Sequence, residues 1–223
     1  MEEEGHHHLV LANAYIKAFL VEIPPHESTL YHRHDLPYVS LPPPPLADGP
    51  STPVASNAGP RPAGPRVSYA LGGFSHSVNN TADVTLRNIA IELLRPQGPA
   101  RNRCAEVIRG QSLENCVTVR KRSSESSAFA SSVETLFETD EISVGEWELA
   151  PGSTIAPADA HLSTLVGGLS GIEEVTAEGD SRLVPQAGLV WLLAGSKTTL
   201  KSGPSGGHFV AIKFKDSGLA SSR

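Results

Sequence analysis

The length, composition and charge of the chain are typical of a globular protein rich in extended structure. Its 223 residues suffice for one large domain or two of ordinary size, and the net charge of −6, without a basic run interleaved with aromatic residues, argues against a nucleic-acid groove. No apolar stretch is long enough for a membrane span. The 20 Gly and 18 Pro residues, without a long amphipathic helical pattern, favour an all-β fold.

The start of the chain, Met-Glu-Glu-Glu-Gly-His-His-His, is acidic where a secretory signal would be basic and then apolar. A cytoplasmic location is therefore the first expectation. His6, His7 and His8 invite a metal-binding interpretation. At a frayed terminus, however, we expect them to have no function or to form a fortuitous tag-like run.

Short runs typical of β-strands recur along the rest of the chain. Each run is bounded by Gly, Pro, Asn, Asp or Ser, which is the pattern of strands joined by turns in a sandwich or barrel. Helix is nearly absent from this prediction. The expected strands cover residues 15–23, 38–41, 67–71, 84–94, 142–149, 162–166, 189–193 and 208–214.

Two irregular segments interrupt the strand pattern. Residues 42–66 include four consecutive prolines, which predicts an extended loop inserted between barrel strands, with a proline-rich recognition ligand as the alternative. Residues 95–138 show little periodicity and are expected to form a linker. This linker contains Cys104 and Cys116, which are either a reduced, inert pair or a disulfide that closes a short loop in an exported protein.

The order of sequence features repeats along the chain. Residues 22–29, Glu-Ile-Pro-Pro-His-Glu-Ser-Thr, align with residues 148–155, Glu-Leu-Ala-Pro-Gly-Ser-Thr-Ile, at an offset of 126. Residues 88–93 resemble residues 209–214 at an offset of 121. This duplication predicts an N-terminal domain over residues 1–94, the linker over 95–138 and a C-terminal domain over 139–223.

Three histidines of the first copy form the main candidate site. One residue separates His32 from His34, so on a strand both imidazoles point to the same face. Further along, Gly72 and Gly73 predict a turn before His76, which an adjoining strand could deliver to the same point. Three neutral nitrogen donors suit Zn, Fe, Ni, Cu or Mn and leave at least one coordination position for water or substrate.

This spacing resembles the two motifs of the cupin superfamily. The first motif is Gly, five residues, His-x-His, three or four residues and Glu, and the second is Pro-x-Gly, two residues, His, three residues and Asn. His26 takes the place of the first Gly, five residues before His32, and Gly73, His76 and Asn80 match the second motif. The resemblance, which is greatest to small bacterial bicupins with a His-Arg-His segment, implies two tandem double-stranded β-helix barrels of the jelly-roll type.

Two positions depart from the cupin motifs. Tyr38 stands where the usual Glu ligand is expected, and Leu71 replaces the motif proline. The resemblance therefore implies an ion held by three histidines, with Tyr38 as a further ligand or as a catalytic proton donor. The Asp35 carboxylate is a less favoured ligand. Arg33 and Asp35 are otherwise expected as outward neighbours of the strand or as hydrogen-bond partners around the site.

The second copy lacks every expected ligand, which predicts a degenerate barrel without a metal in that place. We expect structural or exposed roles for its histidines, His161 and His208. In place of His32, His34, Tyr38, His76 and Asn80 the second copy has, in the same order, Ala158, Ala160, Thr164, Thr198 and Ser202.

The resemblance implies a metal-binding bicupin whose N-terminal barrel holds a divalent ion (Zn, Fe, Mn or Ni) and a small organic ligand. Cupins include dioxygenases and isomerases, so a metal-dependent enzyme of either type is one expectation. A non-catalytic small-molecule-binding or structural module is the alternative. We expect no nucleic-acid or membrane partner, and the vacant second barrel could form a homodimer. An exported protein with a Cys104–Cys116 disulfide is the alternative to a cytoplasmic one.

Overall fold

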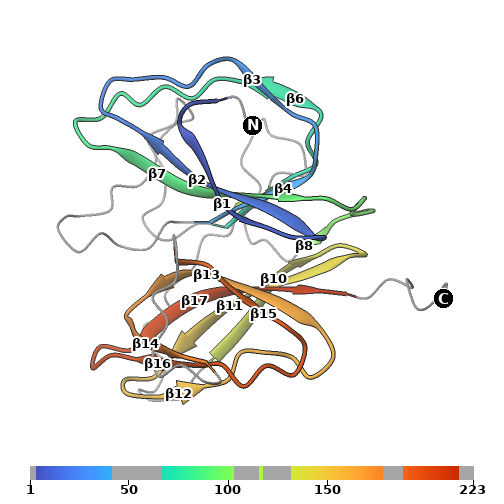
Figure 1. Cartoon of the computed structure of the whole chain (residues 1–223), viewed down its shortest axis with the longest axis vertical. Coiled ribbons are helices and arrows are strands. Elements are labelled where there is room, and N and C mark those ends of the chain that lie inside the picture. The colour runs from blue at the N-terminus through green and yellow to red at the C-terminus, as the bar shows by residue number, and fades with distance from the viewer. Residues whose placement is uncertain (1–3, 42–66, 103–115, 118–131, 178–187, 216–223) are drawn as a thin grey trace. The chain divides into compact units, whose positions relative to one another are not determined.

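The chain folds into two β-sheet units (Figure 1). The computed structural model describes residues 4–41, 67–102, 116–117, 132–177 and 188–215. Unit 1 comprises Met1–Pro96 and Cys104–Arg120, and unit 2 comprises Gln97–Arg103 and Lys121–Arg223. The described residues contain no α-helix, which confirms the all-β prediction. Among them, accordingly, there is no helix with the length and hydropathy that a membrane span needs.

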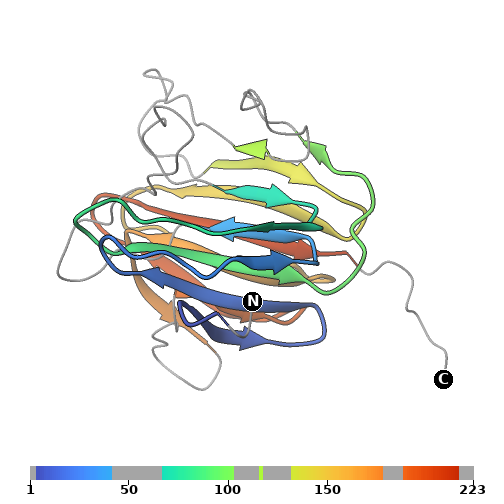
Figure 2. The same ribbon diagram turned by 90° about the horizontal axis from the view of Figure 1, so that it is seen from above.

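Unit 1 consists of a six-stranded sheet and a separate two-stranded sheet, β3–β6, which lies opposite the larger sheet (Figures 1 and 2). The larger sheet has the order β1-β2-β7-β4-β5-β9, and its neighbouring strands are antiparallel. The strands of this unit are β1 (His7–Ala12), β2 (Ile16–Ile23), β3 (His32–His34), β4 (Tyr38–Leu41), β5 (Ser68–Ala70), β6 (Phe74–His76), β7 (Leu86–Leu93) and β9 (Cys116–Val117).

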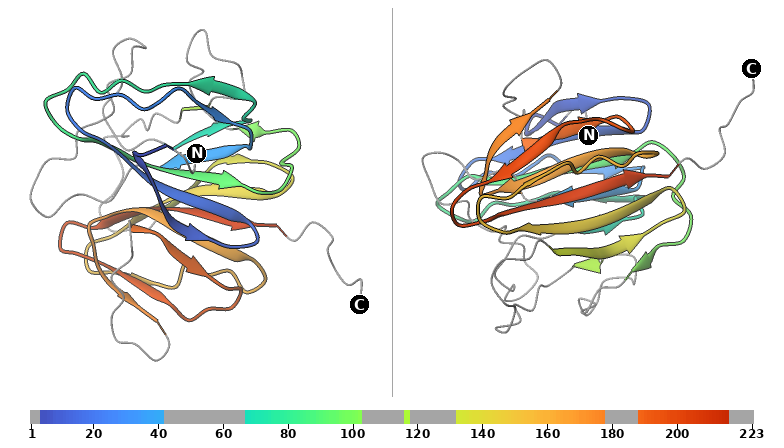
Figure 3. Two further views of the ribbon diagram at one scale, coloured as in Figure 1. Left: turned by 45° about the horizontal axis from the view of Figure 1, so that its top comes forward. Right: turned by 90° about the horizontal axis from the view of Figure 1, so that it is seen from below.

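Unit 2 repeats this plan with a six-stranded sheet and a three-stranded sheet (Figure 3). The larger sheet has the order β15-β13-β17-β11-β10-β8, and the smaller one has the order β12-β16-β14. Its strands are β8 (Arg101–Asn102), β10 (Ser132–Glu138), β11 (Ile142–Leu149), β12 (Thr154–Ile155), β13 (Ser163–Ser170), β14 (Ile172–Thr176), β15 (Val190–Leu192), β16 (Thr199–Ser202) and β17 (Gly207–Phe214).

Strand pairing reproduces the two offsets that the sequence suggested. Ile16 pairs with Leu93 between β2 and β7, and Ile142 pairs with Phe214 between β11 and β17. Ile142 lies 126 positions after Ile16, and Phe214 lies 121 positions after Leu93. The irregularity between Leu9 and Leu11 in β1 recurs in β10, again 126 residues later. The duplication therefore includes β1 and its counterpart β10, which the sequence analysis did not predict.

Strands β1, β8, β9 and β10 change the interpretation of two segments. His7 and His8 lie in β1 and pair with Val21 and Leu20 of β2, so the expectation of a frayed terminus at these residues was wrong. Strands β8, β9 and β10 fall within residues 95–138, where we expected a linker. The loop expected over residues 42–66 lies outside the described residues, and so does Cys104, which with Cys116 was predicted to be either reduced or disulfide-bonded.

Apolar side chains fill the interior of unit 2. The rings of Trp147 and Phe209 stack with their centroids 5.5 Å apart. Ala158, the counterpart of His32, packs against the same core, so this interior is apolar where the first copy carries an imidazole. The buried residues of this cluster are Leu149, Val166, Leu169, Val175, Val190, Leu192, Leu200, Phe209 and Ala211. Unit 1 has a smaller apolar cluster of Val21, Ile23, Leu86 and Ala90, against which Val78 packs.

Candidate metal centre

The small sheet of unit 1 brings the three predicted histidines together. Strands β3 and β6 are antiparallel, with His32 directly opposite His76 and His34 opposite Phe74. His32 and His34 share a face of β3 because side chains alternate along a strand. The structure thus unites residues that lie 42 positions apart in the sequence, His34 and His76.

A glycine turn leads into β6 and sets its position. Gly72 and Gly73 have φ angles of 82° and 77°, a region that glycine occupies without a steric penalty. A Cβ atom on Gly72 would lie 2.4 Å from the carbonyl oxygen of Leu36, just after β3. The Gly73 amide donates a hydrogen bond of 2.6 Å to the carbonyl of His34. The turn is therefore fitted closely against the backbone that carries His34.

Asn80, the last residue of the second cupin-like motif, ties the loop after β6 to the end of β2. Its side chain is buried, and its Nδ2 lies 2.9 Å from each of the carbonyl oxygens of Ile23, Pro24 and Val84. Its Oδ1 accepts the amide of Ala82. Asn80 therefore shapes the site through the backbone.

His26 adopts the backbone conformation that the cupin motif assigns to glycine. Its φ angle is 60°, the one positive value among the non-glycine residues that the structure describes. Gly152, its counterpart 126 positions later, has a φ of 68°. The turn before β3 is thus conserved in shape between the two units although the residue differs.

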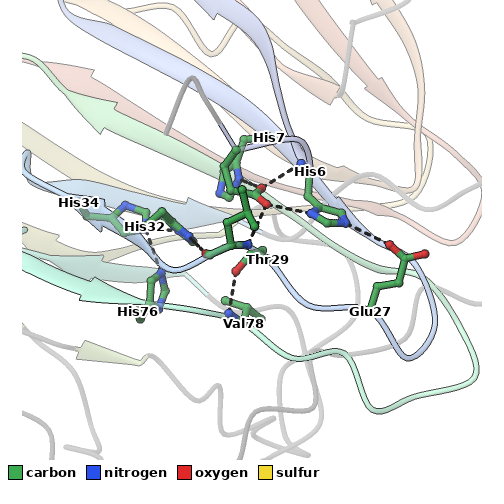
Figure 4. A network of polar contacts seen from close by, with 10 residues as sticks. His6, His7, Glu27, Thr29, His32, His34, His76 and Val78 are labelled. Carbon is green, nitrogen blue, oxygen red and sulfur yellow. Dashed lines mark hydrogen bonds and ion pairs between the residues drawn. The ribbon is translucent and has the colours of Figure 1, made fainter.

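The Nε2 atoms of the three histidines converge (Figure 4). The Nε2 atom of His34 lies 3.0 Å from that of His32 and 2.9 Å from that of His76. One nitrogen from each ring lies within 4.8 Å of the other two. An ion about 2.1 Å from two nitrogens at right angles holds them about 3.0 Å apart, so these separations fit ligands of one ion.

Hydrogen bonding alone does not account for this convergence. The Nδ1 of His32 donates to the carbonyl of Leu30 at 2.8 Å, so a neutral His32 presents a lone pair at Nε2. If His34 Nε2 carried a proton toward His32, it would have no lone pair left to accept one from His76. A cation bound to all three lone pairs satisfies the whole arrangement.

Burial keeps two of the three rings neutral. Burial, followed by the positive charges of His76 and His32, lowers the pKa of His34 to about 3. Burial and the charge of His32 lower the pKa of His76 to about 4. Neutral imidazoles are the form that binds metals, so the protein environment prepares both rings as ligands near neutral pH.

Tyr38 lies against the site, whereas Arg33 and Asp35 lie away from it. The Tyr38 ring stacks on His34 with centroids 4.7 Å apart, and burial raises the pKa of its phenol. Arg33 and Asp35 are exposed and form an ion pair of 2.5 Å with each other. The carboxylate of Asp35 is not among the converging ligand atoms. These two side chains therefore point outward, as the alternation along the strand predicts.

The sequence analysis missed two residues beside the site, Glu4 and His7. The centroids of the His7 and His32 rings lie 5.0 Å apart, with the rings edge to face. The Nδ1 atom of His7 contacts the buried carboxylate of Glu4 at 2.5 Å. The offset of 126 could have revealed β1, which begins at His7, because β1 and β10 occupy equivalent places in the two units.

The chain is similar to known proteins in its fold. No family model and no curated protein matches the sequence. A cupin 2 conserved barrel domain protein from Leptotrichia buccalis matches the structure with a TM-score of 0.53 and 12% identity, over 94% of this chain and 88% of that chain. A salicylate 1,2-dioxygenase from Pseudaminobacter salicylatoxidans matches with a TM-score of 0.57 and 12% identity, over 92% and 75%.

A mutant of a salicylate 1,2-dioxygenase in complex with gentisate also matches, with a TM-score of 0.55 and 11% identity, over 94% of this chain and 74% of that chain. At such identities the likeness concerns the fold. It covers nearly the whole chain in each case and therefore includes both units. The chain has the cupin fold in its tandem, bicupin form, and its first unit carries a cluster of three histidines that could hold a metal ion.

Proposed function

We propose that the chain is a metal-binding bicupin that holds a divalent ion on His32, His34 and His76. The observation that carries this proposal is the convergence of the three Nε2 atoms, with separations of 3.0 Å and 2.9 Å around His34. Zn, Fe, Mn and Ni all accept imidazole ligands, so the donor set does not select one of them. Three protein ligands leave coordination positions open for water or another molecule.

The ligand that we propose for these positions is a small organic molecule with a carboxylate. Three neutral imidazoles leave both positive charges of a divalent ion uncompensated by the protein, because Tyr38 replaces the carboxylate of the cupin motif. An anionic ligand gains more from this charge than a neutral one of the same shape. A salicylate 1,2-dioxygenase mutant of the same fold, in complex with gentisate, is an example of a protein of this fold that binds a small carboxylate.

If the protein is an enzyme, we propose a metal-dependent oxidoreductase of the dioxygenase type or an isomerase. A divalent ion there would act as a Lewis acid or would activate bound water or oxygen. Tyr38 is the proton donor that we propose, because its ring stacks on that of His34 and a tyrosine phenol is protonated near neutral pH. This role differs from that of the charged Glu ligand in the cupin motif.

A non-catalytic binding module is the second candidate. The observation in its favour is the outward position of Asp35, which pairs with Arg33, so that no carboxylate is among the converging ligand atoms of the described residues. In this case the ion would orient a bound ligand without chemical change. Metal-loaded protein that binds small carboxylates but never converts them would favour this function.

Elemental analysis of the protein and its variants tests the metal site. We expect one equivalent of divalent metal per chain, lost in His32→Ala and in His76→Ala. His161→Ala is the matched control, because this histidine is exposed and belongs to unit 2. Metal content that stays unchanged in both site variants would overturn the proposal.

The preference for carboxylates is tested by titrating the metal-loaded protein with small carboxylates and with their neutral amides. We expect binding of the carboxylates that is at least tenfold tighter and that disappears when the metal is removed. Equal binding of acids and amides would contradict the charge argument.

The location of the protein is a separate question, which free-thiol titration of Cys104 and Cys116 tests, since a disulfide would favour export.

A further inference from the structure

We propose that Glu4 and His7, at the N-terminal edge of unit 1, are positioning residues of the metal centre. Glu4 fixes the backbone of Leu30, and Leu30 orients the His32 imidazole. His7 supports the His32 ring from the side (Figure 4). This inference rests on the proposed metal site. It adds that the start of the chain determines how well that site binds.

Glu4 is a buried carboxylate with a full set of donors. It is 4% exposed and accepts hydrogen bonds from the backbone amides of His6 and Leu30 at 2.9 Å and 3.1 Å. The Nδ1 atoms of His6 and His7 lie 2.9 Å and 2.5 Å from its oxygens. Burial favours the neutral acid, but these hydrogen bonds outweigh it and lower the pKa of Glu4 to about 2. Glu4 is therefore an anion that holds four groups in place.

A path of hydrogen bonds runs from Glu4 to the metal ligand His32. The amide of Leu30 donates to Glu4 Oε1 at 3.1 Å, and the carbonyl of Leu30 accepts the Nδ1 proton of His32 at 2.8 Å. That second bond places the proton on Nδ1 and so frees the Nε2 lone pair for an ion. The orientation and tautomer of His32 thus depend on where Leu30 lies.

Little else holds Leu30. Its side chain is 66% exposed, and that of Tyr31 is 77% exposed, so packing contributes little to this stretch. Thr29, just before it, is tied to Val78 by hydrogen bonds of 2.9 Å and 2.8 Å, and β3 begins only at His32. Glu4 therefore restrains the short link between these two anchored points.

His7 restrains the His32 ring itself. Their centroids are 5.0 Å apart at an interplanar angle of 69°, close to the spacing of 4.8 to 4.9 Å among the three candidate ligands. The His7 side chain is 4% exposed and also contacts Phe19 edge to face. His7 thus fills the space between β2 and His32.

The second copy lost these residues together with the ligands. At the offset of 126, His7 corresponds to Val133, as the β10–β11 register reproduces, and in the sequence Glu4 corresponds to Ala130. A carboxylate needed only to attach the first strand would serve equally in both units. Its presence only in the copy with three histidines is expected of a residue that serves the site.

Metal affinity of purified variants, measured by competition with a chromophoric Zn²⁺ chelator, tests this role. We expect Glu4→Ala and Glu4→Gln to weaken Zn²⁺ binding by about 10- to 100-fold, the usual effect of removing an outer hydrogen-bond partner of a ligand. His7→Ala should have a smaller effect in the same direction.

Two matched controls exist. Glu27→Gln removes a carboxylate that contacts His6 at 3.3 Å but has no hydrogen bond to Leu30, and His8→Ala removes an exposed histidine of the same strand. Both should bind Zn²⁺ as the unsubstituted protein does. The absorption spectrum of the Co²⁺-loaded protein should change in Glu4→Gln and stay the same in Glu27→Gln. If Glu4 had a purely structural role, its replacement would leave this spectrum unchanged.

The outcomes separate the two proposals. If the unsubstituted protein binds no Zn²⁺, or if His32→Ala binds it equally well, the metal site itself is refuted. If the unsubstituted protein binds Zn²⁺ and both Glu4 variants match its affinity and Co²⁺ spectrum, only the positioning role is refuted. Glu4→Gln, which keeps the shape and one acceptor oxygen, decides the question if Glu4→Ala does not fold.

Discussion

Replacing Gly72 with alanine should destabilise unit 1 far more than the same change at Gly73. Both glycines have φ near 80°, where an alanine costs about 1–2 kcal/mol more than a glycine. At Gly73 no atom lies within 4 Å of the added Cβ, so this backbone cost is the whole effect. At Gly72 the Cβ would lie 2.4 Å from the carbonyl oxygen of Leu36, and backbone atoms cannot rotate away.

Relieving that clash by moving the backbone adds about 1–3 kcal/mol, as for other overpacked positions. We therefore expect a loss of about 2–5 kcal/mol for Gly72→Ala and about 1–2 kcal/mol for Gly73→Ala. Chemical denaturation followed by circular dichroism measures both in the same buffer. Zn²⁺ affinity should fall more in Gly72→Ala than in Gly73→Ala, because the clash is with Leu36, which follows the strand that carries His34. Equal losses of stability in the two variants would refute this account of the turn.

Three further predictions concern residues around the site. Asn80→Ala should cost about 3 kcal/mol in unfolding free energy, because it leaves buried carbonyl groups without a donor; a loss below 1 kcal/mol would contradict this. His26→Gly should leave the melting temperature unchanged or raise it, since glycine relieves the positive φ and only an exposed contact with Asp83 is lost. The lowered pKa of Glu4, about 2 against a usual 4.5, means that its charge stabilises the fold above pH 4.5 and that this contribution is lost as the pH falls toward 2. The stability difference between the unsubstituted protein and Glu4→Gln, measured by denaturation, should therefore shrink over that range.

The spacing of the histidines, with its resemblance to the cupin motifs, was enough to predict the cluster of three histidines and the fold around it. His32 and His34 share a face because strand side chains alternate, and the Gly72–Gly73 pair signals a turn through its backbone freedom. The offsets of 126 and 121 survive in the strand register because an insertion between pairing positions would disrupt a ladder. The loss of all ligands from the second copy was likewise visible in the residue types.

Only the tertiary structure showed which residues Glu4 and His7 contact. A histidine run beside acidic residues at a chain start has no periodicity that distinguishes a strand from a frayed end, and β1 is defined by its pairing with β2. Glu4 likewise accepts a hydrogen bond from Leu30, 26 positions away, and His7 contacts His32, 25 positions away, so both contacts depend on how the chain folds. Sequence by itself determined which side chains could bind an ion, since ligand chemistry and strand alternation are local. The fold decided which charged and aromatic neighbours hold those side chains, because such contacts form only when distant strands meet.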